Sequence, residues 1–357
     1  MRLIAIRVAL VAVLVSGCGH SEPFGSTPER NEGPLLPGNP AQITHNLLQD
    51  LRPSWLPDGS GILYSYESSP VENRDRCLAI LPPDGGTRST EICNTSVGHL
   101  DSTEVYGPSA VSAGGQLAYS YAQSTPLRVL PNVIQLRVAP LANPQDFMVV
   151  HTLPLGVEGI GINAIGDLHW LSDTMLVYLA QSVAYPPMFT DTIINGVAVA
   201  LVDLRNFTSP VLVPGTQMAT AVSLGDARET IIYTLAGDSR VYRKELATGA
   251  TTVLHDFGTL GIARDAVVQG NRLLAVVGGF VTFTVDPTAG LTQFDLGGPI
   301  YQVDLATGQQ LQLPGGAVPR VFRHPVISPN GAVAAEGYAV RGSFVERVAD
   351  LMLYPAP

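Results

Sequence analysis

Residues 53–67 read PSWLPDGSGILYSYE, and this stretch decides which fold the chain can adopt. Its centre, PDGS at 57–60, combines residues that favour a tight turn. The turn separates Trp55 from the apolar run at 62–64, and two apolar runs joined in this way are typical of a β-hairpin. Whether this hairpin stands alone or is one copy of a repeat decides the architecture.

The hairpin recurs along the chain. When the sequence is aligned on the apolar run that ends in Tyr64, similar segments occupy 108–121, 169–180, 221–236, 266–279 and 325–338. The position of Tyr64 is then held by Tyr119, Tyr178, Tyr233, Ala275 and Ala335. Each copy reads as strand, turn, strand, and a third apolar segment follows each one. The sequence therefore predicts six repeats of an all-β unit with almost no helix.

A fourth apolar segment follows five of the six copies, as TEIC (90–93), FMVVHTL (147–153), PVLVPG (210–215), TTVLHD (251–256) and LQLPG (311–315). The missing one lies at the other end of the chain, where AQITHNLL (41–48) has the same character. Four-stranded sheets that repeat every 40–60 residues or so are typical of β-propellers. We therefore predict a six-bladed β-propeller over 41–357, in which the N-terminal strand completes the last blade and removes an open sheet edge.

A seven-bladed ring is the alternative. Residues 279–298 (GFVTFTVDPTAGLTQFDLGG) could form one more hairpin, but they do not contain a full set of four strands. An insertion in the fifth blade is the simpler prediction. The recurring aromatic residues, including Trp55, Trp170 and the row that begins at Tyr64, are predicted to pack between blades rather than to bind a ligand.

Two segments carry a family resemblance. PSWLPDG (53–59) with ILYS (62–65), and HPVISPNG (324–331), resemble the repeat of TolB-type propellers, also called WD40-like or PD40 repeats. VDLATG (303–308) and ELATG (245–249) resemble the usual continuation of that repeat. The resemblance covers the chain from residue 41 and implies the propeller fold. TolB itself carries an α/β domain before its propeller, which residues 19–40 are too short to form, so the partners of TolB are not carried over.

The first residues read as a targeting signal. MRLIAIRVALVAVLVSGC (1–18) contains Arg2, Arg7 and an apolar stretch at 8–15 that is too short to cross a bilayer. It ends in VSGC, which resembles a bacterial lipobox and implies cleavage before Cys18 and lipidation of that residue. An ordinary secretory signal with a chance cysteine is the alternative. We predict a lipoprotein signal peptide (1–17), a lipidated cysteine with a flexible linker (18–40) and the propeller (41–357).

The predicted location is the bacterial cell envelope. Gly19 follows the cysteine, in place of the aspartate that is associated with inner-membrane retention in some bacteria, which favours the outer membrane, facing the periplasm or the cell surface. In such an oxidising compartment Cys77 and Cys93 could form a disulfide, because the turn PDGG (83–86) lies midway between them. Free buried thiols are the alternative.

The composition argues against nucleic acid as a partner. The net charge is −10, and the 20 Lys and Arg residues form no cluster that would bind phosphates. The motifs GxSxG, SxxK and HExxH are also missing, so no catalytic nucleophile or zinc-binding helix is predicted. His169 and His324 lie on or just before innermost strands and could face the channel, but three or four converging metal ligands cannot be assembled. No metal and no cofactor are therefore predicted.

One loop is a candidate binding surface. Residues 182–192 (SVAYPPMFTDT) contain the apolar cluster Tyr185, Pro186, Pro187, Met188 and Phe189. Exposed apolar residues on a loop often mark an interaction site, although they could also fold back onto the domain. The predicted function is a lipid-anchored, non-catalytic binding module with a protein or glycan partner. The alternatives are a polysaccharide lyase or hydrolase that uses His169, His324, Asp167 and Asp265, and a structural envelope protein.

Overall fold

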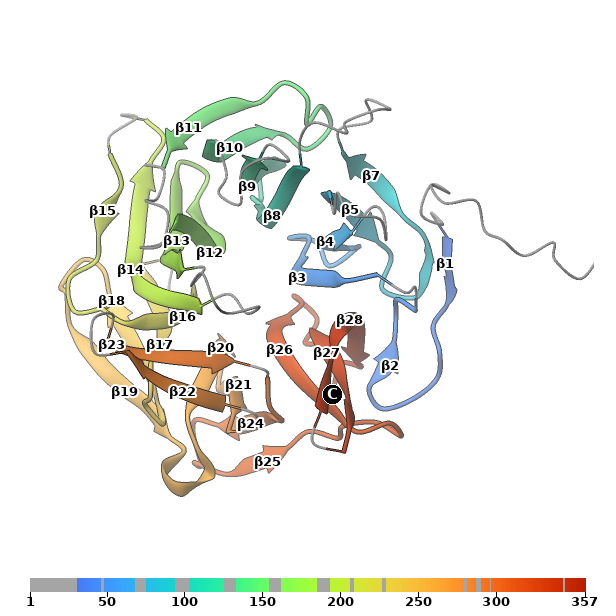
Figure 1. The fold of residues 1–357 in the computed structure, drawn as a ribbon, viewed down its shortest axis with the longest axis vertical. Coiled ribbons are helices and arrows are strands. Elements are labelled where there is room, and N and C mark those ends of the chain that lie inside the picture. Colours follow the sequence, from blue (N-terminus) through green and yellow to red (C-terminus); the bar gives the residue numbers. More distant parts are fainter. Residues whose placement is uncertain are drawn as a thin grey trace, which may run out of the picture.

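The chain forms an all-β, propeller-like ring of sheets around a centre (Figure 1). The computed structural model describes residues 31–45, 48–67, 75–93, 103–124, 133–153, 162–184, 193–205, 209–226, 229–278, 281–286, 290–295, 297–342 and 344–357. Within these ranges, the only helix is the short 3₁₀ turn Gly258–Leu260. None of the described helical structure is long and apolar enough to span a membrane.

Three four-stranded sheets follow one another in the middle of the chain, each with its first strand nearest the centre. One contains β12 (Ile162–Ser172), β13 (Met175–Ala184), β14 (Ile193–Asp203) and β15 (Val211–Leu212). The next contains β16 (Ala219–Leu224), β17 (Thr230–Leu235), β18 (Arg240–Glu245) and β19 (Thr251–Asp256). The third contains β20 (Ala263–Gln269), β21 (Arg272–Val277), β24 (Ile300–Asp304) and β25 (Gln310–Gln312).

The N-terminal part of the ring is one larger sheet made of two four-stranded groups. The first group contains β3 (Asp50–Trp55), β4 (Ile62–Glu67), β5 (Arg76–Leu81) and β7 (Ser89–Ile92). The second contains β8 (Thr103–Val111), β9 (Gln116–Ser124), β10 (Val133–Pro140) and β11 (Met148–Thr152). A single parallel pairing of Arg76 with Val105 joins the groups, so each keeps the strand order of the other sheets.

The last sheet combines the two ends of the domain. It contains β26 (Arg320–Ile327), β27 (Val333–Arg341), β28 (Phe344–Tyr354) and, from the N-terminal side, β2 (Ala41–Gln42). Ala41 pairs with Leu353, and the backbone N–H of Ile43 donates to the carbonyl of Leu351. The pairing that the sequence predicted between the N-terminal strand and the last sheet is thus present, and it covers the outer edge of β28.

The core consists of apolar layers between neighbouring sheets. The six aligned positions that begin at Tyr64 all fall on second strands, and none is more than 4% exposed. The indole N–H of Trp55 donates to the carbonyl of Val326, and that of Trp170 donates to the carbonyl of Ala110, so each tryptophan reaches the innermost strand of the preceding sheet. The predicted structural role of these aromatic residues is confirmed.

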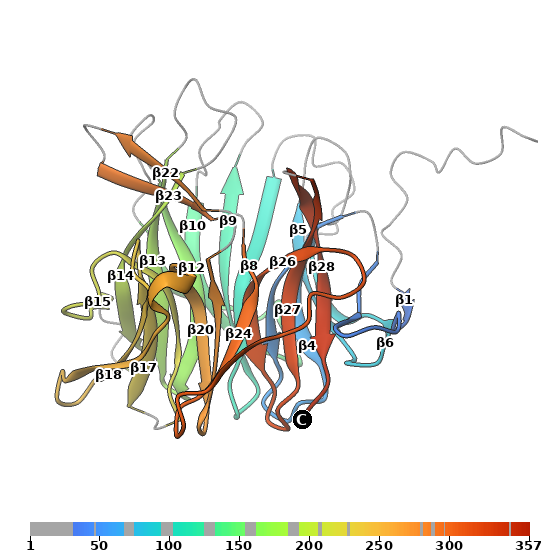
Figure 2. The same cartoon turned by 90° about the horizontal axis from the view of Figure 1, so that it is seen from below.

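Residues 281–286 and 290–295 form an added hairpin rather than another blade. β22 (Val281–Asp286) pairs only with β23 (Gly290–Asp295), as a separate two-stranded sheet between β21 and β24. In Figure 2 this hairpin lies at one end of the ring, beyond the four-stranded sheets. The prediction of an insertion is confirmed.

The linker predicted over 18–40 is partly ordered, which corrects that expectation. β1 (Asn31–Pro34) pairs with β6 (Gly85–Thr87), and the N–H of Leu35 donates to the carbonyl of Asp84. The turn after β5 exposes backbone groups that an extended neighbouring segment can satisfy, and the Pro- and Gly-rich composition of 31–40 gave no sign of this pairing. The predicted signal peptide and Cys18 lie outside the described residues.

Cys77 and Cys93 form a disulfide, with their Cα atoms 4.8 Å apart. β5 and β7 pair with Leu78 opposite Ile92, so the two cysteines come opposite each other one step further along. The bond closes a loop with a sequence separation of 16 residues.

We expect the Cys77→Ala/Cys93→Ala variant to lose about 3 kcal/mol of stability, because a cross-link over a loop of this length restricts the unfolded chain by about that amount. Urea unfolding of the variant and of the wild-type chain, with and without a reducing agent, measures the effect. Reducing agent should lower the wild-type midpoint and leave that of the variant unchanged. Equal midpoints for the oxidised and reduced wild-type chain would contradict this expectation.

Candidate central polar site

Irregular pairing in the innermost strands brings polar residues to the centre of the ring. The register shifts between Leu51 and Ser54 in β3, and the innermost strands β12, β20 and β26 have comparable shifts. Arg52, Asp265 and His324 lie within these irregular segments and have φ values of 55°, 46° and 47°. Left-handed backbone conformations are uncommon for residues with a Cβ, and where they occur they are often found at active or binding sites.

Arg52 links three sheets. Its guanidinium Nη1 donates to Oδ1 of Asp167 at 2.9 Å and lies 3.3 Å from Nδ1 of His324. Its backbone N–H donates to Oε1 of Glu336 at 2.7 Å. The second carboxylate oxygen of Glu336 accepts from the hydroxyl of Tyr338 at 2.6 Å. The guanidinium of Arg52 therefore offsets the negative charge of the buried Asp167, and the backbone N–H of Arg52 donates a hydrogen bond to a second acid, Glu336.

Asp167 connects the cluster to the sheet that follows it. Oδ2 of Asp167 accepts from the backbone N–H of Val222 at 2.9 Å. Burial raises the pKa of this carboxyl to about 6, although the nearby Arg52 opposes the rise, and the negative Asp265 adds to it.

His324 lies among three carboxyl groups. Its backbone N–H donates to Oδ2 of Asp265 at 3.1 Å, and its Nδ1 lies 3.6 Å from Oδ1 of Asp265 and 3.8 Å from Oδ1 of Asp167. Its Nε2 lies 3.9 Å from Oε1 of Glu336. Burial and the neighbouring Arg52 keep the pKa of His324 well below its ordinary value, so the ring is neutral at pH 7 and these contacts are not ion pairs.

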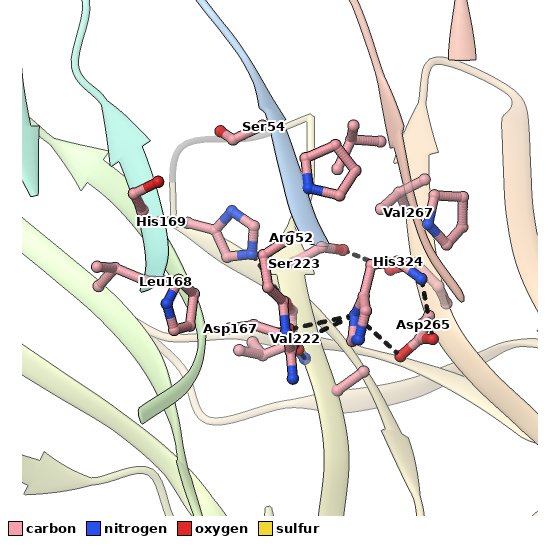
Figure 3. A pocket seen from close by; sticks show the side chains of 17 residues that line it. Arg52, Ser54, Asp167, Leu168, His169, Val222, Ser223, Asp265, Val267 and His324 are labelled. Atoms are coloured by element: carbon pink, nitrogen blue, oxygen red, sulfur yellow. Dashed lines mark hydrogen bonds and ion pairs between the residues drawn. The ribbon is translucent and has the colours of Figure 1, made fainter. Parts of the chain in front are cut away.

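His169 points to the neighbouring sheet. Its Nε2 lies 2.9 Å from the carbonyl oxygen of Val222, so Nε2 carries the proton and donates it. Burial lowers the pKa of His169 to about 4, which keeps this ring neutral as well. Figure 3 shows His169 and His324 on different sides of Arg52.

The innermost strands of the six four-stranded units line a cavity of about 50 Å³ at this point. It is lined by Arg52, Asp167, His169, Asp265, His324 and by smaller residues from β3, β8, β12, β16, β20 and β26 (Figure 3). A binding site for a drug-sized ligand is roughly 300–1,000 Å³, whereas this volume suits a few water molecules. Among the described residues, no group of three or more His, Cys, Asp or Glu side chains has the geometry of a metal site.

The two histidines predicted as channel residues both line this cavity, together with Asp167 and Asp265. Arg52 and Glu336 were not predicted. Arg52 stands directly before the PSWLPDG segment, in the position that His324 takes before PVISPNG. This equivalence in the repeat is the sequence feature that could have placed Arg52 beside His324 at the centre. The apolar loop from Tyr185 to Phe189 lies outside the described residues.

Acid is expected to destabilise the fold through His169. The pKa of His169 is about 4 in the folded chain and about 6.5 when exposed. The neutral His169 ring therefore contributes fully to the free energy of unfolding above pH 6.5, and this contribution is lost as the pH falls through about 4. The loss amounts to at most about 3 kcal/mol. Asp167 has a raised pKa and acts in the opposite direction, since its contribution is lost as the pH rises through about 6.

His169→Gln, which keeps a donor for the Val222 carbonyl, should therefore make stability less sensitive to pH between 6.5 and 4. Denaturant unfolding at several pH values measures this, with His255→Gln on the outermost strand β19 as the matched control. If the wild-type chain and both variants show parallel pH profiles, His169 does not have the role assigned to it.

Comparisons with known proteins show the fold and no closer relationship. No family model and no curated protein sequence match the chain. A luciferin-regenerating enzyme is similar in structure, with 11% sequence identity, coverage of 85% of this chain and 90% of that chain, and a TM-score of 0.51. TolB from Acinetobacter baumannii has 13% identity, 84% and 64% coverage and a TM-score of 0.48. An oligogalacturonate lyase in complex with manganese has 15% identity, 91% and 97% coverage and a TM-score of 0.45.

Proposed function

We propose that residues 41–357 form a six-bladed β-propeller that serves as a non-catalytic binding module, anchored by lipid at Cys18 in the bacterial cell envelope. The observation that carries this proposal is the central site. Its charged groups contact one another, both histidines are neutral, and the cavity of about 50 Å³ is smaller than the usual sites for organic ligands. The blade count follows from taking the joined N-terminal sheet as two blades.

The connections between strands indicate which face would meet a partner. In the six four-stranded units, the first and second strands are joined by 2–6 residues. The second and third strands are joined by 8 residues at 68–75, 125–132 and 185–192 and by 22 residues at 278–299, whereas the connections at 236–239 and 342–343 have only 4 and 2 residues. Because the strands are antiparallel, these two sets of connections lie on opposite faces of the ring. Long loops on a rigid scaffold commonly carry binding residues, so we assign the partner site to the face with the long connections.

Covalent capture in the native host tests this assignment. The full chain should cross-link to a defined protein or glycan partner. Replacing the five residues at 185–189 by Gly and Ser should weaken that capture, because it removes the apolar cluster. A matched replacement of the turn at 246–250, on the opposite face, should leave capture unchanged. Capture that is equal for both variants, or no specific partner at any salt concentration, would overturn the assignment.

The second candidate function is an enzyme, and a specific observation favours it. Asp167 has a pKa raised to about 6 and lies near His324 and Asp265, which is an arrangement that acid–base catalysis can use. Turnover of a polysaccharide panel distinguishes the candidates. Cleavage that is abolished by both Asp167→Asn and His324→Gln, in variants that remain folded, would establish catalysis at this site.

A further inference from the structure

A larger cavity lies between two sheets, away from the centre. It has a volume of about 410 Å³, which falls in the range of small-molecule sites. One wall comes from the sheet β16–β19 and the other from β20 and the turns that follow β20 and β24. The turns Gly225–Asp226 and Gly270–Asn271 place it toward the face with the short connections, opposite the proposed partner face.

Part of the lining of this cavity is apolar. Ile232 forms a fully buried part of the lining at 1% exposure, and Leu254, Val268 and Leu305 contribute partly buried surface. These side chains belong to the apolar layer between the two sheets, so the surface exists without any rearrangement. A ligand with an apolar side chain would gain the free energy of removing that surface from water.

Two opposite charges lie at the same cavity. Arg243 on β18 and Asp226 in the turn after β16 are both exposed, and Asn271 adds an amide. Neither charged side chain forms an ion pair with another residue in the described part of the chain. In contrast, exposed arginines elsewhere are paired, as Arg205 is with Asp203 and Arg240 with Asp238. The guanidinium and the carboxylate of this cavity thus remain available to a ligand of complementary charge.

We propose that this cavity binds a small apolar zwitterion, either a free apolar amino acid or a dipeptide. The carboxylate of the ligand pairs with Arg243, the ammonium pairs with Asp226, and the apolar side chain contacts Leu254, Val268 and Leu305. This site is independent of the proposed partner face and of the central cluster.

Isothermal titration of the purified full chain in detergent tests the proposal with four probes: L-leucine, leucyl-leucine, N-acetyl-leucine and leucinamide. A zwitterion should bind, and the comparison of leucine with leucyl-leucine shows whether the cavity prefers a free amino acid or a dipeptide. N-acetyl-leucine lacks the ammonium and leucinamide lacks the carboxylate, so each should bind about tenfold more weakly than leucine.

Variants locate the binding. Arg243→Gln and Asp226→Asn should each weaken binding of the zwitterion about tenfold or more, and Arg243→Gln should remove the preference for leucine over leucinamide. Arg205→Gln changes an exposed arginine on another sheet and should have no effect. Thermal unfolding shows whether each variant is folded. The proposal is overturned if neither leucine nor leucyl-leucine binds at millimolar concentration, or if binding survives both charge substitutions unchanged.

Discussion

Replacing Arg52 with methionine should lower the free energy of unfolding by about 3 kcal/mol at pH 7, the largest loss expected from one substitution in the polar centre. The guanidinium is the direct partner of Asp167 at 2.9 Å, and without it the buried carboxyl groups of Asp167 and Glu336 lose a neighbouring positive charge. The loss lies at the lower end of the range for a broken buried pair, because 21% of the Arg52 side chain is exposed.

Chemical denaturation of a matched set measures this effect. Arg205→Met removes an arginine that is 63% exposed and should cost less than about 1 kcal/mol. Arg52→Met/Asp167→Asn should recover part of the loss, since a neutral amide replaces the unpaired carboxyl group. A cost for Arg52→Met no greater than that for Arg205→Met would show that the central pair does not stabilise the ring.

The second large effect concerns the strand that joins the two ends of the domain. Ile43→Ala should cost about 3 kcal/mol, because Ile43 is fully buried and packs in the apolar layer with Tyr64, Ala334 and Leu351. Removing its side chain leaves a cavity beside β28 while the hydrogen bond to the Leu351 carbonyl remains possible. Thr44→Val should add a smaller loss of about 1 kcal/mol, since Oγ1 of Thr44 accepts from the N–H of Leu351.

Leu212→Ala is the control for this strand. Leu212 is 52% exposed on the outermost strand β15, so its truncation should change stability by less than about 0.5 kcal/mol. Urea unfolding of the three variants gives the comparison. Similar small losses for Ile43→Ala and Leu212→Ala would mean that the N-terminal strand contributes little to the ring.

The repeat predicted the fold because it depends on local chemistry. Turn residues such as Gly, Asp, Asn and Ser between two apolar runs specify a hairpin in each copy. The position of Tyr64 recurs on the second strand of each of the six four-stranded units. The pairing of β1 with β6 was not predictable in this way. β1 hydrogen-bonds exposed backbone groups of β6, and its sequence, NEGP, has no alternation of apolar and polar residues that would predict a strand.

The polar centre was only partly predictable from sequence. The place of His324 and His169 in the repeat indicated that they could face the channel, but the contacts of Arg52 depend on register shifts, which arise from the pairing of each innermost strand with its neighbour. Glu336 had one recognisable signal. It stands in the apolar run AVAAEGY of a predicted strand, and a buried carboxylate requires a partner. The sequence could not show that this partner would be the backbone of Arg52, 284 residues away.

Genetic complementation with Asp167→Asn tests most directly whether the centre is structural rather than catalytic. The substitution keeps an acceptor for the Val222 N–H and removes the acid that catalysis would need. In the host, we expect a folded Asp167→Asn chain, present at the wild-type level, to restore fully whatever deletion of the wild-type chain disrupts. Failure of that folded variant to restore it, while the chain with the replaced 185–189 segment does so, would contradict the account.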